Sequence, residues 1–81
     1  MNNMKTMLEL HEWLESIDCE VRRDLGNDED IIMWWYWIET KGDKTVGIFP
    51  TQISPEFLTK SALLEWANAN QKEVEQSVLV G

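Results

Sequence analysis

The sequence has few of the residues on which metal sites and nucleophilic active sites are built. Cys19 and His11 are the only cysteine and the only histidine. A structural zinc site needs about four thiolate or imidazole ligands, and a cysteine–histidine catalytic pair would have to come from these two residues. A lone cysteine also excludes an intramolecular disulfide, which fits a reducing compartment. We expect Cys19 to be a small buried residue and His11 to lie at the edge of a helix's apolar face.

Several other motifs are missing from the chain. The four glycines are scattered, so no glycine-rich phosphate loop is formed. No apolar run is long enough to span a membrane, and the first residues lack the basic and apolar regions of a secretory signal. Asp28–Asp30 lacks the spaced ligands of a calcium loop. We therefore expect a cytoplasmic protein that is not an enzyme and that uses no cofactor or metal.

Basic residues are scarce as well. The chain has 7 lysines and arginines against 15 acidic residues, for a net charge of −8. The first thirty residues hold nine acidic and three basic side chains, so the acidity is concentrated there. Phosphate contacts need clustered bases, and here only Arg22 and Arg23 adjoin. Direct binding to nucleic acid or to an anionic membrane is not expected, whereas a basic protein surface would be attracted.

What the chain has in abundance is aromatic side chains in its middle. Residues 31–40 contain three of the five tryptophans and the only tyrosine, with no charge before Glu39. β-Branched and aromatic residues predict a strand. Alternation along a strand places Met33, Trp35 and Trp37 on one face. The opposite face carries Ile32, Trp34, Tyr36 and Ile38. Because both faces are apolar, either both are covered or one is kept for a partner.

Two elements are predicted before this strand. Residues 4–17 form an amphipathic helix, with Trp13 half exposed at the boundary of its apolar face. That apolar face is made of Met4, Met7, Leu8, Leu10, Leu14 and Ile17. Residues 18–25 alternate between apolar and charged side chains, which predicts a strand with one face on a core. Residues 26–30 then form a turn, because glycine and asparagine tolerate positive φ.

A third strand and a second helix are predicted after it. A two-residue turn within residues 41–44 would pair Thr40 with Thr45 and Trp37 with Ile48, and Pro50 would end the third strand. Ser54 is a candidate N-cap with proline at the first helical position, and the helix can restart near Ser61. Its apolar stripe is made of Leu63, Ala67, Asn70 and Val74. The last residues, 78–81, are too few to place.

The predicted architecture is a single small α+β domain over residues 1–81, in the order α-β-β-β-α. It consists of a three-stranded antiparallel meander with the helices packed mainly on one face. The other face would then present some of Trp34, Tyr36 and Phe49. This order resembles the double-stranded-RNA-binding fold in topology alone. The start of the last helix brings only Lys60, beside Glu65, so the resemblance does not imply RNA binding.

Two features could serve a partner. Acidic side chains recur about every 4.5 Å along a helix and about every 6.6 Å along a strand, spacings that imitate a nucleic-acid backbone. Arg22 and Arg23 interrupt this acidic band, and it is alternatively a solvated surface. Tryptophan and tyrosine are enriched at binding hot spots, although they can also fill a core. The predicted partner-binding residues are Glu9, Glu12, Trp13, Asp18, Glu20, Asp28, Glu29, Asp30, Trp34 and Tyr36.

The function expected from these features is binding rather than catalysis. One hypothesis is an inhibitor of the kind carried by phages and mobile elements, which occupies a basic, nucleic-acid-handling surface of a host protein. Another is an immunity or antitoxin-type protein that neutralises a basic toxin. A third is a homodimeric structural or adaptor protein whose aromatic face is buried between two copies. Electrostatic steering of a cationic partner is common to the first two hypotheses, so the sequence does not separate them.

Overall fold

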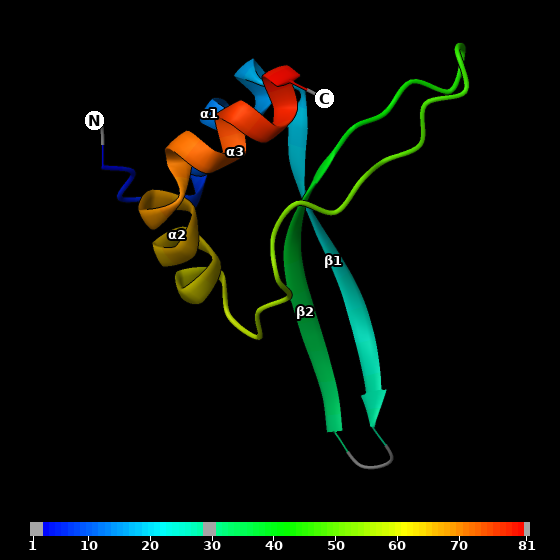
Figure 1. The fold of residues 1–81 in the computed structure, drawn as a ribbon. Coiled ribbons are helices and arrows are strands. Elements are labelled where there is room, and N and C mark those ends of the chain that lie inside the picture. Colours follow the sequence, from blue (N-terminus) through cyan, green and yellow to red (C-terminus); the bar gives the residue numbers. More distant parts are fainter. Residues whose placement is uncertain (1–2, 29–30, 81) are drawn as a thin grey trace.

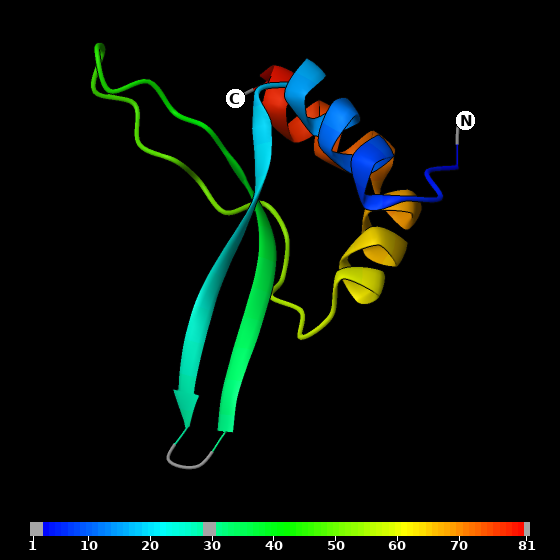
Figure 2. The same ribbon diagram turned by 180° about the vertical axis from the view of Figure 1, so that it is seen from behind.

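The computed structural model describes residues 3–28 and 31–80 of the 81 (Figure 1). It has three helices and a two-stranded antiparallel sheet, which confirms the α+β class. The elements are α1 (Met7–Ser16), β1 (Cys19–Asp28), β2 (Ile31–Thr40), α2 (Lys60–Ala69) and α3 (Gln71–Val80). The helices gather on one side of the hairpin, and a long loop extends on the other side (Figures 1 and 2).

Helix α1 is shorter than predicted because its start is fixed by a cap. The hydroxyl of Thr6 accepts the backbone N–H of Glu9 at 3.2 Å, and the Glu9 carboxylate accepts the backbone N–H of Lys5 at 3.3 Å. Leu8 was expected on the apolar face, but it is 67% exposed. The buried stripe is centred on Leu10, and a residue two positions away lies nearly opposite on a helix.

The hairpin of β1 and β2 is in a continuous register from Cys19 opposite Thr40 to Asp28 opposite Ile31. Strand β2 has the predicted bounds. Strand β1 continues to Asp28, three residues further than predicted. The predicted turn over residues 26–30 is therefore wrong for residues 26–28, which belong to the strand. Gly26 suits the strand because the indole of Trp35 occupies the space where a Cβ would stand. Glu29 and Asp30, the rest of that predicted turn, lie outside the described residues.

One face of the hairpin meets the helices. Val21 lies opposite Ile38 and Arg23 opposite Tyr36, so these residues share a face. Ile38 is fully buried, and Val21 and Tyr36 pack against the core. The prediction that Tyr36 belongs to an open face is therefore wrong. Trp37 points to the opposite face of the hairpin, which no helix covers.

The predicted third strand over residues 45–49 is wrong. A later segment, residues 51–57, instead runs antiparallel along the free edge of β2. The N–H of Thr40 donates to the carbonyl of Thr51 at 2.9 Å, and Tyr36 and Phe57 exchange two bonds of 2.8 and 2.7 Å. Pro55 interrupts this segment because proline has no N–H to donate. It therefore forms isolated bridges and no regular strand.

Residues 41–50 form a projecting loop, which we call the arm (Figure 2). The predicted pairs of Thr40 with Thr45 and of Trp37 with Ile48 are not made. Asp43 and Ile48 instead exchange two backbone hydrogen bonds of 2.8 Å around a four-residue turn. Gly47 closes that turn at a φ of +74°, a conformation that favours glycine. The arm therefore turns back on itself and makes no ladder with β2.

The second half of the chain folds as two helices. Helix α2 begins at Lys60, where the Thr59 hydroxyl accepts the N–H of Ala62 at 3.1 Å. The predicted start at Ser54 is wrong, because that residue is bound to β2. A break at Asn70 separates α2 from α3, and α3 extends to Val80. The end of the chain that the sequence left unplaced is thus helical as far as residue 80.

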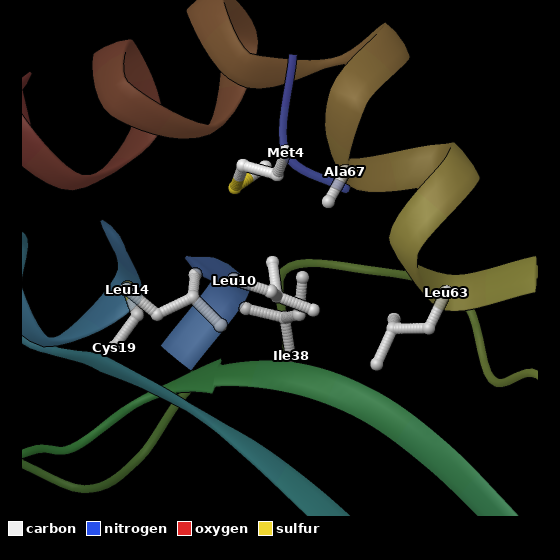
Figure 3. Close-up of a cluster of buried hydrophobic side chains, with 7 residues drawn as sticks. All are labelled: Met4, Leu10, Leu14, Cys19, Ile38, Leu63 and Ala67. Carbon is white, nitrogen blue, oxygen red and sulfur yellow. The ribbon is translucent and has the colours of Figure 1, made fainter. Parts of the chain in front are cut away.

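The core is small and is built from aliphatic side chains (Figure 3). Its cluster of buried residues is Met4, Leu10, Leu14, Cys19, Ile38, Leu63 and Ala67. Asn68 fastens the N-terminal segment over it, since its side-chain amide exchanges two hydrogen bonds of 2.8 Å with the backbone of Met4. None of the five tryptophans is fully buried. Trp13 and Trp66 pack against the edge of the core, and none of the indoles forms its centre.

Candidate protein-binding surfaces

An acidic groove lies between α1 and α3. Its volume is about 640 Å³, and Glu9 and Glu12 from α1 and Glu75 from α3 line it around Trp13. Met4, Gln71 and Lys72 complete the lining. The structure thus brings together three of the predicted binding residues and adds a third carboxylate that the sequence pattern did not indicate.

Trp13 connects the two walls of this groove. Its Nε1–H donates to Oε1 of Glu75 at 2.9 Å, and the ring is half-buried, as predicted. Glu9 also supports the start of α1 through its bond to Lys5, so its carboxylate has a structural role. Glu12 is exposed and is the acidic residue of the groove whose replacement disturbs the fold least.

The rest of the predicted acidic band does not continue this groove. Asp18 lies at the turn after α1 with a φ of +56°. Glu20 lies on the face of the hairpin that points away from the helices. On the same face, Arg22 forms ion pairs with Glu20 at 3.3 Å and with Glu39 at 3.2 Å. The side chain of Asp28, like Glu29 and Asp30, is outside the described part of the chain. The described acidic residues therefore form separate patches.

The aromatic residues of β2 are also divided. Trp34 is 42% exposed, and the guanidinium of Arg23 lies over its ring, 4.7 Å from the ring centre. Tyr36 is half-buried below the ammonium of Lys60, 5.9 Å from its ring centre. On the other face the Nε1–H of Trp37 donates to Glu39 at 3.0 Å. Of the two predicted binding residues on β2, Trp34 is exposed and Tyr36 is half-buried.

Three of the exposed large apolar side chains outside the predicted site lie on the arm. Val46 is 66% exposed, Ile48 57% and Phe49 82%. The hydrophobic pattern had placed all three in a third strand, and only Phe49 was named among the residues that its uncovered face could present. The segment contains Gly42, Gly47 and Pro50, which are unfavourable in a paired strand. These three residues are the signal that could have identified an exposed loop.

A second hollow lies at the base of the arm. Its volume is about 630 Å³, and it is lined by Phe49 of the arm, Ile53 of the returning segment and Val78 of α3, among others. Lys41 at the arm's base forms an ion pair with Glu15 of α1, and its N–H donates to the carbonyl of Asp18 at 3.0 Å. The arm is therefore fixed to the body at its base while its tip is open to solvent.

Three groups have displaced pKa values with clear physical causes. Burial raises the pKa of Cys19, and the negative charge of Asp18 acts in the same direction. The hydrogen bond to Glu15 raises the pKa of Lys41. The hydrogen bonds from Thr45 lower the pKa of Asp43. Lys41 and Asp43 both line the hollow at the base of the arm, whereas Cys19 is buried in the core.

The described residues contain no group of three or more histidine, cysteine, aspartate or glutamate side chains placed to hold a metal ion. No helix within residues 3–28 and 31–80 is long and apolar enough to cross a membrane.

The fold and these surfaces define a small α+β protein with an acidic helical groove and a projecting apolar arm. The chain was compared with protein-family models, with curated proteins and with solved structures, and none of these comparisons found a match.

Proposed function

We propose that this chain is a small acidic protein that binds a basic surface of another protein and modulates it. The observation that carries this proposal is the arm, whose Val46, Ile48 and Phe49 are exposed. Nearly the whole side chain of Phe49 faces solvent, although burial of such a ring would stabilise a fold by about 2–3 kcal/mol. Contiguous exposed apolar side chains on a soluble chain are typical of an interaction site.

The charge of the chain supports a cationic partner. A net charge of −8 accelerates encounter with a basic surface and discourages binding to acidic ones. The groove between α1 and α3 adds the carboxylates of Glu9, Glu12 and Glu75 in one place. Basic surfaces of this kind are typical of proteins that handle nucleic acid. The proposed role is therefore an inhibitor that occupies such a surface, as phage and mobile-element proteins do.

The arm is tested by capturing partners from the native host with the full chain and with a Phe49→Ser variant. The matched control is Leu8→Ser, because Leu8 is another largely exposed apolar residue and lies on α1. We expect Phe49→Ser to lose the captured protein and Leu8→Ser to retain it. Equal capture by both variants would refute the role of the arm.

The charge is tested by the salt dependence of the captured complex. We expect affinity to fall steeply between about 0.05 M and 0.5 M salt, because the Debye length shrinks several-fold. Glu12→Lys should weaken binding more than Glu65→Lys, which places the same change on the exposed surface of α2. A nucleic acid that the partner binds should compete with the chain. A salt-independent complex without such competition would refute the inhibitory role.

If the chain self-associates, the partner of the arm would be a second copy of the chain and not another protein. Sedimentation over a concentration series distinguishes the two cases. A dimer that Phe49→Ser dissociates and Leu8→Ser preserves would assign the exposed apolar side chains of the arm to a second copy of this chain.

A further inference from the structure

A cleft of about 230 Å³ lies between α1, the hairpin and the start of α2. It is lined by Met7, His11, Val21, Arg23, Tyr36 and Lys60. None of these six described residues is acidic, although the chain carries more than twice as many acidic as basic residues. Three separate elements thus each bring a basic side chain to one small cleft.

No described residue forms an ion pair with Arg23 or Lys60 of the cleft. Within residues 3–28 and 31–80, the ion pairs involve Arg22 and Lys41, and neither Arg23 nor Lys60 takes part in one. Arg22 is the instructive contrast, because it is adjacent in β1 but points to the opposite face, where it meets Glu20 and Glu39. Because side chains alternate along a strand, Arg22 meets carboxylates on one face, whereas Arg23 on the other face has no ion pair with a described residue.

Aromatic rings support both cations. Arg23 lies 4.7 Å from the ring centre of Trp34, and Lys60 lies 5.9 Å from that of Tyr36. A cation–π contact uses the face of a guanidinium and leaves its in-plane N–H donors for an anion. The ammonium of Lys60 likewise retains donors for an oxyanion. The rings therefore position these two groups without using up their hydrogen-bonding capacity.

We propose that this cleft binds a small phosphate monoester. The guanidinium of Arg23 and the ammonium of Lys60 match a phosphate dianion better than they match a singly charged carboxylate. His11 supplies a further nitrogen at the same cleft. Met7 and Val21 provide an apolar wall for a short organic body. The volume lies below the range of about 300–1,000 Å³ that is typical of drug-sized ligands, so that body is small. The cleft shares no lining residue with the arm or the acidic groove, and the proposal is independent of the protein-binding role.

The experiment is a titration of the isotope-labelled full chain, followed by NMR, at constant ionic strength. The probes are phenyl phosphate, inorganic phosphate and acetate. We expect saturable shifts at the backbone amides of Arg23 and Lys60 and at the indole N–H of Trp34. Phenyl phosphate should bind more tightly than inorganic phosphate, because it adds an apolar body, and acetate should bind most weakly. Acetate binding as tightly as the phosphates would overturn the assignment to a phosphate monoester.

Substitutions locate the binding to this cleft. Arg23→Gln and Lys60→Gln should each weaken phenyl phosphate binding on the order of tenfold, since each removes a charged hydrogen-bond donor. The matched control is Arg22→Gln on the opposite face, which should leave the affinity unchanged. Circular dichroism checks that each variant is folded, and Lys60→Gln carries the test if Arg23→Gln is not. An equal loss in Arg22→Gln, or shifts that never saturate, would refute the site.

Discussion

The hydroxyl oxygen of Ser54 accepts the backbone N–H of Ile38 at 2.7 Å, in the buried interior of the protein. The same hydroxyl donates to the carbonyl of Pro55 at 2.9 Å. The residue after Ser54 is a proline and cannot continue a ladder of backbone bonds, so a side chain satisfies the strand at this point. This contact joins the returning segment to the centre of β2.

Ser54→Ala should therefore destabilise the protein. The substitution leaves a buried N–H of Ile38 without a partner, which costs about 1–3 kcal/mol. Urea denaturation followed by circular dichroism measures the loss. Ser61→Ala is the control, because Ser61 is exposed on α2, and its effect should stay within about 0.5 kcal/mol. Equal effects of the two substitutions would show that the contact to Ile38 contributes nothing.

Gly26→Ala should also destabilise the fold, because an added Cβ would overlap the indole of Trp35. Overpacking of this kind costs about 1–3 kcal/mol. A double-mutant cycle with Trp35→Ala isolates the cause, since removing the ring removes the overlap. Thermal unfolding of the four proteins is the measurement. A cost for Gly26→Ala that persists in full without the indole would contradict the explanation.

The stability of the protein should be insensitive to the exposed ring of Phe49 on the arm. Phe49→Ser changes an exposed residue, and its effect on unfolding should stay within about 0.5 kcal/mol. Ile38→Val, which removes a single buried methylene, should cost about 0.5–1.5 kcal/mol. Guanidinium unfolding of both variants tests the contrast. A larger cost for Phe49→Ser than for Ile38→Val would place the ring in a packed environment.

Cys19 should make the stability depend on pH in the alkaline range. Burial raises the pKa of its thiol above the ordinary value of 9.0, so the folded protein holds a proton that the unfolded chain has released. This stabilisation is complete below about pH 9 and is lost as the pH rises through the raised pKa. Unfolding midpoints measured between pH 8 and about 10 should fall for the native chain.

Cys19→Ala provides the control, because it removes the titrating group and should flatten this dependence. The range ends near pH 10 because the pKa of Lys41 is also raised, and its ion pair with Glu15 is lost at higher pH. The folded native chain should also react slowly with thiol reagents, since the thiolate is the reactive form. Rapid modification of the folded protein would contradict the burial of this thiol.

The hydrophobic pattern was sufficient to predict the elements whose conformation is determined by their own side chains. Strand β2 was predicted with its correct bounds because β-branched and aromatic residues fill it without interruption. Helix α1 was recognised because Leu10 and Leu14 repeat at helical spacing. The third strand was wrong because backbone bonds, not side-chain alternation, select the segment that pairs with β2. Pro50 and Pro55 determine where that pairing can occur, and the periodicity does not contain this information.

The candidate sites were predicted less completely than the fold. Glu9, Glu12 and Trp13 lie on one helix, so their proximity follows from local spacing. Glu75 joins them from α3, and only the packing of the two helices brings it there. The basic cleft was missed for the same reason, since Arg23 and Lys60 are distant in sequence. Residues from separate elements converge through tertiary structure, which a linear pattern does not reveal.

The closure of the arm has a consequence for engineering. Asp43 and Ile48 are joined by two backbone bonds, and Thr40 is joined to Thr51 below them. The ends of the four-residue turn are therefore held at a constant separation by groups that do not depend on its side chains. Residues 44–46 form a graft position where a foreign peptide of suitable span could be displayed on this scaffold, with Gly47 kept to close the turn.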